Sequence, residues 1–282
     1  MIQKKLLHIL TFFLSKLSLR AVHILGKYFG MLYFSCNKKS YNILKENIER
    51  SRIFEKINIS QAIKQNTQEL GKSILETLYL WGSSQEKVQS LVNKIHGQEI
   101  IDKAEKRGKG IIFLTPHLGC FEIASLFYGA TKPVTIMYRK ARKKWMSDLM
   151  VNGRKKGFVK MASTDSMGLR KILIALRNSE AVGILPDQVA DKGQGEMVNF
   201  FGRPAYTMVL TNNLIKRTEA SIIMLYGERL KNGIGFDIHF KLINRKNIST
   251  PLELNKQLEL FIRKNPTQYY WSYDRFKKIT NK

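Results

Sequence analysis

The stretch GIIFLTPHLGCFE, residues 110–122, decides both the fold and the expected place of the chemistry. Residues 110–114 are an apolar run with β-branched and aromatic side chains, and a proline and a glycine follow it closely. Such a run, closed by turn-forming residues, is typical of a buried strand that ends at a turn. His117 and Glu122 therefore follow the carboxyl end of a strand, where open α/β sheets present their functional groups.

The spacing of His117 and Glu122 restricts how they can act together. In a regular helix, two side chains that are five residues apart point in directions that differ by about 140°. The two can meet only if His117 lies in the turn and Glu122 in the following helix, and Pro116 and Gly119 favour such a break. A carboxylate bonded to one ring nitrogen fixes the histidine tautomer and leaves the other nitrogen free to accept a proton. We therefore expect His117 to act as a base that removes the proton of a hydroxyl, with Glu122 orienting its ring. The spacing alone, however, favours a purely structural histidine.

From residue 108 onward, apolar runs alternate with amphipathic stretches. This alternation predicts the α/β class, with a mostly parallel mixed sheet flanked by helices and a final antiparallel pair around residues 231–233. The expected strands are residues 110–114, 134–137, 182–185, 222–226 and 234–240. The expected helices are residues 121–128, 145–156, 169–177, 208–217 and 252–264.

The chain divides into three expected segments. Residues 1–36 hold an amino-terminal membrane-associated helix, residues 37–107 a helical region, and residues 108–282 the α/β core. The helical region has breaks near residues 51–52 and 82–84, and its amphipathic stretch 63–81 is expected to pack on the core. Since no linker rich in Pro, Gly or Ser separates the last two segments, we expect them to form one domain.

The charge of the chain restricts its partners. Forty-eight basic and 22 acidic residues give a formal net charge of +26, while 44% hydrophobic residues support a core. Such a surface is expected to bind a polyanion, whether nucleic acid, an anionic bilayer, a phosphorylated lipid or an acidic carrier protein. The two cysteines, Cys36 and Cys120, exclude a disulfide framework and a cysteine zinc site, which fits a reducing setting. We expect no metal and no cofactor, so that chelators leave the activity intact.

The amino terminus favours a membrane surface among these polyanions. Residues 6–34 are mostly apolar, and four basic side chains interrupt them. In a helix these four fall within about 60° of one another and form one stripe. The stretch lacks the roughly 20 uncharged residues of a span, and no small-residue cleavage site follows it. We expect an amphipathic helix lying on an anionic membrane, with a buried helix or a tilted span as alternatives. The four basic residues are Lys16, Arg20, His23 and Lys27.

Beyond its first sixty residues the chain resembles the late acyltransferases of lipid A biosynthesis, the lauroyl or myristoyl transferases. The histidine motif alone is shared by many glycerolipid acyltransferases, whose fold the resemblance also implies. Combined with the FFGRP segment and the PTQY tail, it is specific for the lipid A family. The matching segments, in the family's order, are TPHLGCFE (115–122), MYR (137–139), NGRKKG (152–157), LPDQ (185–188), NFFGRPAYT (199–207), GER (227–229) and NPTQYYW (265–271).

The resemblance implies a reaction. A fatty acyl group, lauroyl at family level, moves from acyl carrier protein to a hydroxyacyl chain of a Kdo-bearing lipid A precursor, at the cytoplasmic face of the inner membrane. Because a hydroxyl is a poor nucleophile at neutral pH, it needs a base, which His117 would supply. Arg154 matches the family's essential arginine and is expected to stabilise the oxyanion. A covalent intermediate on Cys120 is an alternative, less favoured than packing of a small thiol.

Further residues are expected to contact substrates. Asp187 follows an expected strand and is predicted to hold Arg154, to shape the acceptor site or only to cap a turn. The segment Phe201-Gly202-Arg203 resembles a loop near the acceptor, with Arg203 available for a phosphate. Arg139 opens a basic run, residues 139–144, that suits either the anionic lipid precursor or acidic acyl carrier protein.

Two other functions remain open at the level of sequence. An acyltransferase acting on another glycolipid or on a glycerophospholipid could use the same base, although the FFGRP and carboxyl-terminal motifs argue against it. A nucleic-acid-binding protein would match the net charge, but the chain has no zinc pattern, no aromatic RNA-binding strand and no helix-turn-helix pattern. We therefore expect an acyltransferase and no nucleic-acid partner.

Overall fold

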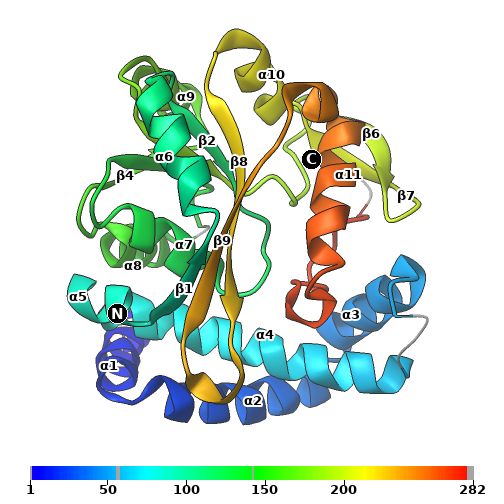
Figure 1. Cartoon of the computed structure of the whole chain (residues 1–282). Helices are drawn as coiled ribbons and strands as arrows, with labels where there is room; N and C mark the ends of the chain where they lie inside the picture. The colour runs from blue at the N-terminus through cyan, green and yellow to red at the C-terminus, as the bar shows by residue number, and fades with distance from the viewer. Residues whose placement is uncertain (1, 55–57, 142, 278–282) are drawn as a thin grey trace.

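A computed structural model describes residues 2–54, 58–141 and 143–277, and its centre is a seven-stranded sheet (Figure 1). The strand order is β1-β9-β8-β2-β5-β3-β4; all neighbouring pairs are parallel except β8 and β9, which are antiparallel around the turn Lys231–Gly233. The predicted α/β class and mostly parallel mixed sheet are confirmed. The strands are β1 (Val92–His96), β2 (Ile111–Leu114), β3 (Val134–Tyr138), β4 (Val159–Ser163), β5 (Ala181–Ile184), β8 (Ser221–Arg229) and β9 (Phe236–Leu242).

Helices cover both faces of this sheet because the side chains of its central strands alternate between two cores. Ile112 and Leu114 of β2 belong to the core beneath α9, α10 and α11, whereas Ile111 and Phe113 belong to the core beneath α6 and α7. A separate hairpin, β6 (Gly195–Phe200) and β7 (Arg203–Met208), packs against α11. The helices are α6 (Gln98–Arg107), α7 (Phe121–Tyr128), α8 (Lys144–Arg154), α9 (Ser166–Arg177), α10 (Leu210–Arg217) and α11 (Pro251–Ile262).

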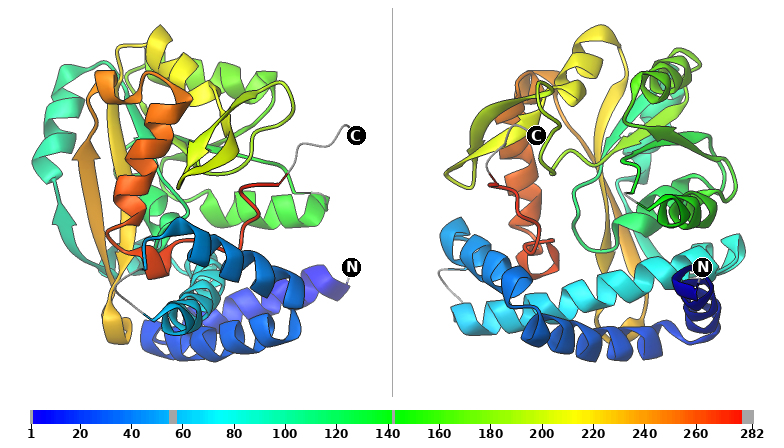
Figure 2. Two further views of the ribbon diagram at one scale, coloured as in Figure 1. Left: turned by 90° about the vertical axis from the view of Figure 1, so that its right-hand side faces the viewer. Right: turned by 180° about the vertical axis from the view of Figure 1, so that it is seen from behind.

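The amino-terminal helices lie together at one end of the sheet (Figures 1 and 2). The long helix α4 (Ile59–Gly82) crosses beneath the strands, and α1 and α2 pack along it. Glycines allow the close contact of α2 and α4: a Cβ atom on Gly30 would lie 2.1 Å from the Thr67 carbonyl oxygen, and one on Gly71 would lie 2.1 Å from that of Gly26. The remaining helices before β1 are α3 (Lys38–Ser51) and α5 (Gln85–Ser90).

The single amino-terminal helix expected from the sequence is wrong. The chain forms α1 (Ile2–Lys16) and α2 (Leu19–Cys36), because Ser18 caps α2 by accepting a hydrogen bond from the Ala21 N–H at 3.2 Å. His23 is also not part of a surface stripe: it is buried, and its Nε2 lies 2.5 Å from Glu76 of α4.

The outer surface of α1 and α2 is nonetheless strongly apolar. No helix within residues 2–54, 58–141 and 143–277 combines the length and the apolar character needed to cross a membrane. Several large apolar side chains of α1 and α2 are instead exposed to solvent. They include Leu6, Ile9, Phe12, Phe13, Ile24, Leu25, Tyr28 and Leu32.

Candidate active site

The histidine motif forms a tight turn between β2 and α7. As the spacing required, His117 lies in the turn and Glu122 lies in the first turn of α7. Gly119 has a φ of +62°, and a Cβ atom there would come within 2.1 Å of the Gly227 carbonyl oxygen, so only glycine fits. The turn is fixed further by Ser73 of α4, whose hydroxyl donates to the Gly119 carbonyl oxygen at 3.0 Å.

His117 is oriented by Asp187, which follows β5. The ring Nδ1 lies 2.7 Å from Oδ1 of Asp187, and the backbone N–H of His117 donates to Oδ2 at 2.8 Å. The two residues meet because β2 and β5 are parallel neighbours, with Leu114 opposite Ile184, so their loops leave the same edge of the sheet.

The Asp187 carboxylate is buried and ionised. Burial would raise its pKa, but the charge of His117 and the two hydrogen bonds outweigh burial and hold the pKa below its usual range. An ionised carboxylate only accepts hydrogen bonds, so the proton of a neutral His117 ring is on Nδ1. Nε2 then carries the lone pair of the ring, and this lone pair accepts a hydrogen bond from the Gln188 side-chain amide at 3.2 Å.

The predicted bond between Glu122 and His117 is wrong. Glu122 instead accepts from Arg154 at the end of α8, with 2.9 Å between Nε and Oε2 and a second bond from Nη2 to Oε1. Its Oε2 also accepts from the Trp81 indole N–H at 3.3 Å. No hydrogen bond in the described part of the chain joins Glu122 to His117. Glu122 is turned toward α8 and α4, whereas the ring of His117 is turned toward the loop after β5.

Arg154 is therefore held by Glu122, and not by Asp187 as one reading of the sequence suggested. Both side chains are buried. Burial would lower the Arg154 pKa, but the charge and hydrogen bonds of Glu122 raise it. The arginine is thus a fixed cation beside the histidine turn.

His117 lies between two cavities. One, of about 230 Å³, adjoins the ends of β3 and β5 and contains Arg139, Arg154 and Gln188 in its wall. The other, of about 210 Å³, runs along α4 and has a mainly apolar wall. The second cavity is lined by Leu70, Ser73, Ile74, Thr77, His117, Phe121, Gln268 and Tyr270.

Two aromatic rings flank the histidine between these cavities. The centroid of Phe121 is 4.9 Å from that of His117, and the centroid of Tyr270 is 6.0 Å away. The His117 side chain is 14% exposed, so the ring is accessible yet restricted in movement. In this position His117 can accept a proton from a hydroxyl in one cavity while an apolar group occupies the other.

The FFGRP segment is at the turn of the β6–β7 hairpin. Phe201 is buried against Trp271, with 5.3 Å between ring centroids, and Gly202 forms the turn with a φ of +73°. Arg203 pairs with Glu46 of α3 at 2.9 Å. None of these three described residues lines either cavity beside His117. Their contact with substrate stays a prediction, whereas Arg139 does line the first cavity and pairs with Asp191 at 3.0 Å.

A buried ion-pair network behind the turn had no predicted role in the sequence. Arg229 of β8 contacts Glu76 of α4, with 2.5 Å between Nε and Oε1, and Glu69 at 2.7 Å. Its Nη2 donates to Ser73 at 3.1 Å and to the Gly119 carbonyl oxygen at 3.4 Å. The GER motif was the only sequence signal for this network, which connects α4, β8 and the histidine turn.

Cys120 is an inert thiol in this structure. It is 3% exposed, and burial, reinforced by the negative charge of Glu76, raises the pKa of the thiol well above its usual value. A nucleophilic cysteine needs a lowered pKa and access to substrate. Core packing therefore describes Cys120 better than a covalent intermediate does.

Among the described residues, a group of three side chains able to hold a metal ion is found on β1 and β9, and none is found around His117. His117 lies on both cavities, Arg139 and Arg154 lie on the first, and the wall of the second is mainly apolar. Their arrangement suits proton transfer beside an apolar substrate.

Known proteins share this sequence pattern. The family model described as bacterial lipid A biosynthesis acyltransferase matches residues 4–278. The chain is 24% identical over 226 residues to the lipid A biosynthesis palmitoleoyltransferase of Escherichia coli (strain K12), covering 76% of this chain and 71% of that protein. It is also 24% identical over 267 residues to the lipid A biosynthesis lauroyltransferase of that organism, covering 91% and 85%.

Proposed function

The chain belongs to the family of bacterial lipid A biosynthesis acyltransferases, and we propose from this membership and the geometry of His117 that it transfers a fatty acyl group from acyl carrier protein to a hydroxyacyl chain of a Kdo-bearing lipid A precursor. It is an acyltransferase of lipid A biosynthesis. The observation that carries the proposed mechanism is the hydrogen-bonded pair of His117 and Asp187 between two cavities.

In the proposed reaction Nε2 of His117 accepts the proton of the acceptor hydroxyl while the oxygen attacks the thioester carbonyl carbon. Asp187 stabilises the imidazolium that forms and holds the ring in position. When the tetrahedral intermediate collapses, the carbon–sulfur bond breaks and the proton passes from His117 to the leaving thiolate. The products are an ester and the free thiol of acyl carrier protein, and no acyl-enzyme is required.

We propose that Arg154 stabilises the oxyanion of the tetrahedral intermediate. Its guanidinium is a fixed cation that lines the same cavity as His117, and Glu122 holds it in place through two hydrogen bonds. A donor that is positioned before the reaction stabilises developing charge without reorganising. Glu122 is then a positioning residue for Arg154, and Asp187 is the positioning residue for His117.

The two cavities suggest where the apolar and the polar parts of the substrates bind. The mainly apolar cavity along α4 suits part of an acyl chain, and the cavity with Arg139 and Arg154 suits a polar or anionic group. We propose that the transferred fatty acyl group is lauroyl. The match to the lauroyltransferase spans more of both proteins than the match to the palmitoleoyltransferase does.

We further propose that α1 and α2 lie on an anionic membrane surface, at the cytoplasmic face of the inner membrane. Exposed apolar patches of this extent are unusual on a surface that faces only water. Lys16 extends over the ring of Phe12 and Lys27 over that of Tyr28, which places cations among the exposed apolar side chains. This combination is typical of helices in the headgroup region.

The decisive experiment measures transfer of a labelled acyl group from acyl carrier protein to a Kdo-bearing lipid A precursor in detergent micelles. We expect transfer by the wild type and a loss of roughly a hundredfold or more in His117→Ala. Unchanged transfer by the variant would overturn His117 as the base. A folded wild type that acylates a glycerophospholipid and leaves the lipid A precursor untouched would overturn the acceptor.

A further inference from the structure

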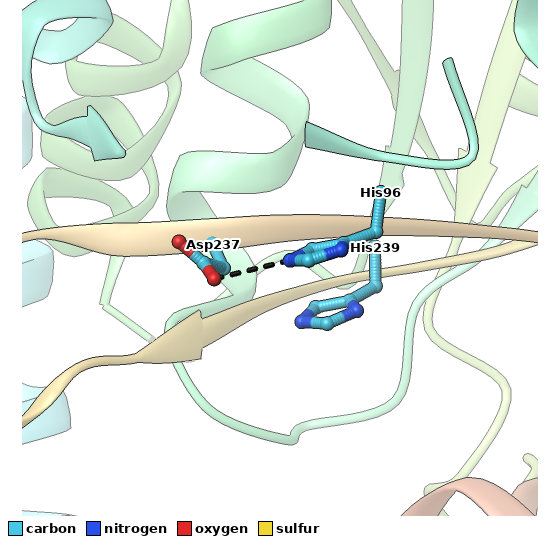
Figure 3. A group of neighbouring side chains, drawn as sticks. All are labelled: His96, Asp237 and His239. Carbon is cyan, nitrogen blue, oxygen red and sulfur yellow. Dashed lines mark hydrogen bonds and ion pairs between the residues drawn. The ribbon is translucent and has the colours of Figure 1, made fainter. Parts of the chain in front are cut away.

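Two histidines that are far apart in the sequence stack face to face near one edge of the sheet (Figure 3). His96 ends β1, and His239 is its register partner in β9. Their ring centroids are 4.4 Å apart and their planes differ by 9°. On its other side His239 stacks on the buried ring of Tyr226 at 4.6 Å. The pairing of β1 with β9 therefore brings the two imidazoles together at this edge of the sheet.

Two carboxylates lie beside the nitrogen atoms of these rings. Asp237 is two residues before His239 on the same face of β9, and its Oδ2 is 3.1 Å from Nε2 of His96. Glu228 is the register partner of Asp237 in β8, and its Oε2 is 2.8 Å from Nε2 of His239. Asn93 donates to the second oxygen of Asp237 at 2.9 Å, which fixes that carboxylate from outside the group.

The three side chains lie close enough for a small dication to gather their donor atoms, once the two rings turn out of the parallel stack so that a nitrogen of each faces the ion. One donor atom from each of His96, Asp237 and His239 lies within 4.8 Å of the others. Zinc–ligand bonds of about 2.0–2.2 Å place neighbouring ligand atoms of a tetrahedron about 3.3–3.6 Å apart. The distance of 3.1 Å between His96 Nε2 and Asp237 Oδ2 would open by only a few tenths of an ångström.

We propose that His96, Asp237 and His239 bind a divalent first-row transition-metal ion, with water completing its coordination. Imidazole and carboxylate are the ligand types that such ions, zinc above all, take in proteins. The His96 side chain is 48% exposed, so an ion can enter from solvent.

The proposed ion would cross-link strands at the edge of the sheet. β1 is the edge strand and pairs with β9 alone, so ligands on β1 and β9 join the edge strand to its neighbour. The role is structural and separate from acyl transfer. Within β8 the side chains alternate, so Glu228, which contacts His239, and the buried ion-pair network around Arg229 are on opposite faces of the sheet. The proposal is therefore independent of the proposed reaction.

The test adds Co²⁺ alone to the purified full-length chain, in detergent micelles, after chelation and without a histidine tag. We expect visible d–d absorption that saturates at one ion per chain and disappears when Zn²⁺ displaces Co²⁺. His96→Ala and His239→Ala should each weaken Co²⁺ binding by roughly tenfold or more, since losing even an outer-shell partner of a metal ligand has that effect. His8→Ala, which removes an exposed histidine of α1, should bind as the wild type does.

Thermal unfolding gives a second measurement. Zn²⁺ should raise the unfolding temperature of the wild type and of His8→Ala, because a ligand of the folded state stabilises it, and should leave that of His96→Ala unchanged. His96 is exposed, so this variant should unfold cooperatively as the wild type does when no metal is present. Absence of saturable Co²⁺ absorption in the wild type, or equal affinity in wild type and folded His96→Ala, would overturn the proposal.

Discussion

Nδ1 of His117 lies 2.7 Å from Oδ1 of Asp187, a residue 70 positions further along the chain. The nearer carboxylate in sequence, Glu122, is bonded to Arg154. The two buried carboxylates of the site thus hold different partners. Asp187 orients the proposed base, and Glu122 orients the proposed oxyanion donor.

The first prediction concerns Asp187→Asn. The carboxylate accepts from both the ring and the backbone N–H of His117, but an asparagine has one side-chain oxygen and can accept only one of these bonds well. We expect kcat to fall roughly a hundredfold or more, with little change in KM. Steady-state acyl transfer by wild type, Asp187→Asn, His117→Ala and the double variant is the measurement. Losses that multiply in the double variant would contradict a shared role, since residues that act as one unit are not additive.

The second prediction separates the structural and catalytic roles of Glu122. Glu122→Met leaves the buried guanidinium of Arg154 uncompensated, which should cost about 3–5 kcal/mol of unfolding free energy. Adding Arg154→Met removes the orphaned charge and should restore most of that stability, while acyl transfer stays lost. Chemical denaturation and the transfer assay are run on the same three proteins. Wild-type transfer by the double variant would exclude Arg154 as the oxyanion donor.

Much of the fold is readable from local sequence. Every strand and helix expected after residue 108 is present, because the central strands are continuous apolar runs bounded by turns. The edge strands β1 and β4 were missed: Val92–His96 has mostly exposed side chains, and Val159–Ser163 mixes buried with exposed ones. A strand with a neighbour on one side only has no need of a continuous apolar run, so its pattern resembles a loop.

The site was predictable only in part for a related reason. The turn that carries His117 is encoded in consecutive residues, so the motif located it. The pairing of His117 with Asp187 depends instead on β5 lying next to β2, and strand order is a property of the whole sheet. Likewise, the contact of His96 with His239 requires β1 to pair with β9, although the two residues are separated by more than half of the sequence. Sequence spacing carries no signal for either contact.

The third prediction uses the buried pair of Glu76 and Arg229 to set an acid limit on stability. Burial would raise the Glu76 pKa, but the Arg229 charge and hydrogen bonds outweigh it, so the folded-state pKa lies below the ordinary 4.5. A depressed carboxyl pKa contributes stability that is present above pH 4.5 and is lost as the pH falls toward the folded-state value.

Glu76→Gln should therefore cost about 3–5 kcal/mol at neutral pH and flatten the decline of stability below pH 4.5. Urea unfolding from pH 7 downward is the measurement, with the exposed Glu99→Gln of α6 as the control. Equal slopes in wild type and Glu76→Gln would show that this pair does not set the acid limit.

The fourth prediction concerns the thiol inside the histidine motif. Because Cys120 is buried with a raised pKa, it is a poor nucleophile, and Cys120→Ala should retain acyl transfer within a few-fold of the wild type. The exposed Cys36 should react with iodoacetamide in the folded protein, and Cys120 should not. Mass spectrometry of the enzyme mixed with acyl carrier substrate completes the test. An acyl adduct on Cys120 would contradict the direct mechanism.

The fifth prediction tests the apolar surface of α1. Phe13 is 62% exposed, so Phe13→Ser should not perturb the core, but it removes a ring that would enter the bilayer boundary. Burying such a side chain contributes about 1.5–3 kcal/mol, so binding to vesicles with anionic lipid should weaken roughly tenfold or more. Leu260→Ser, which changes a comparably exposed side chain on α11, is the matched control and should bind as the wild type does. Equal loss in both variants would show that α1 is not the membrane-facing surface, and the sedimented fraction at rising lipid concentration measures the difference.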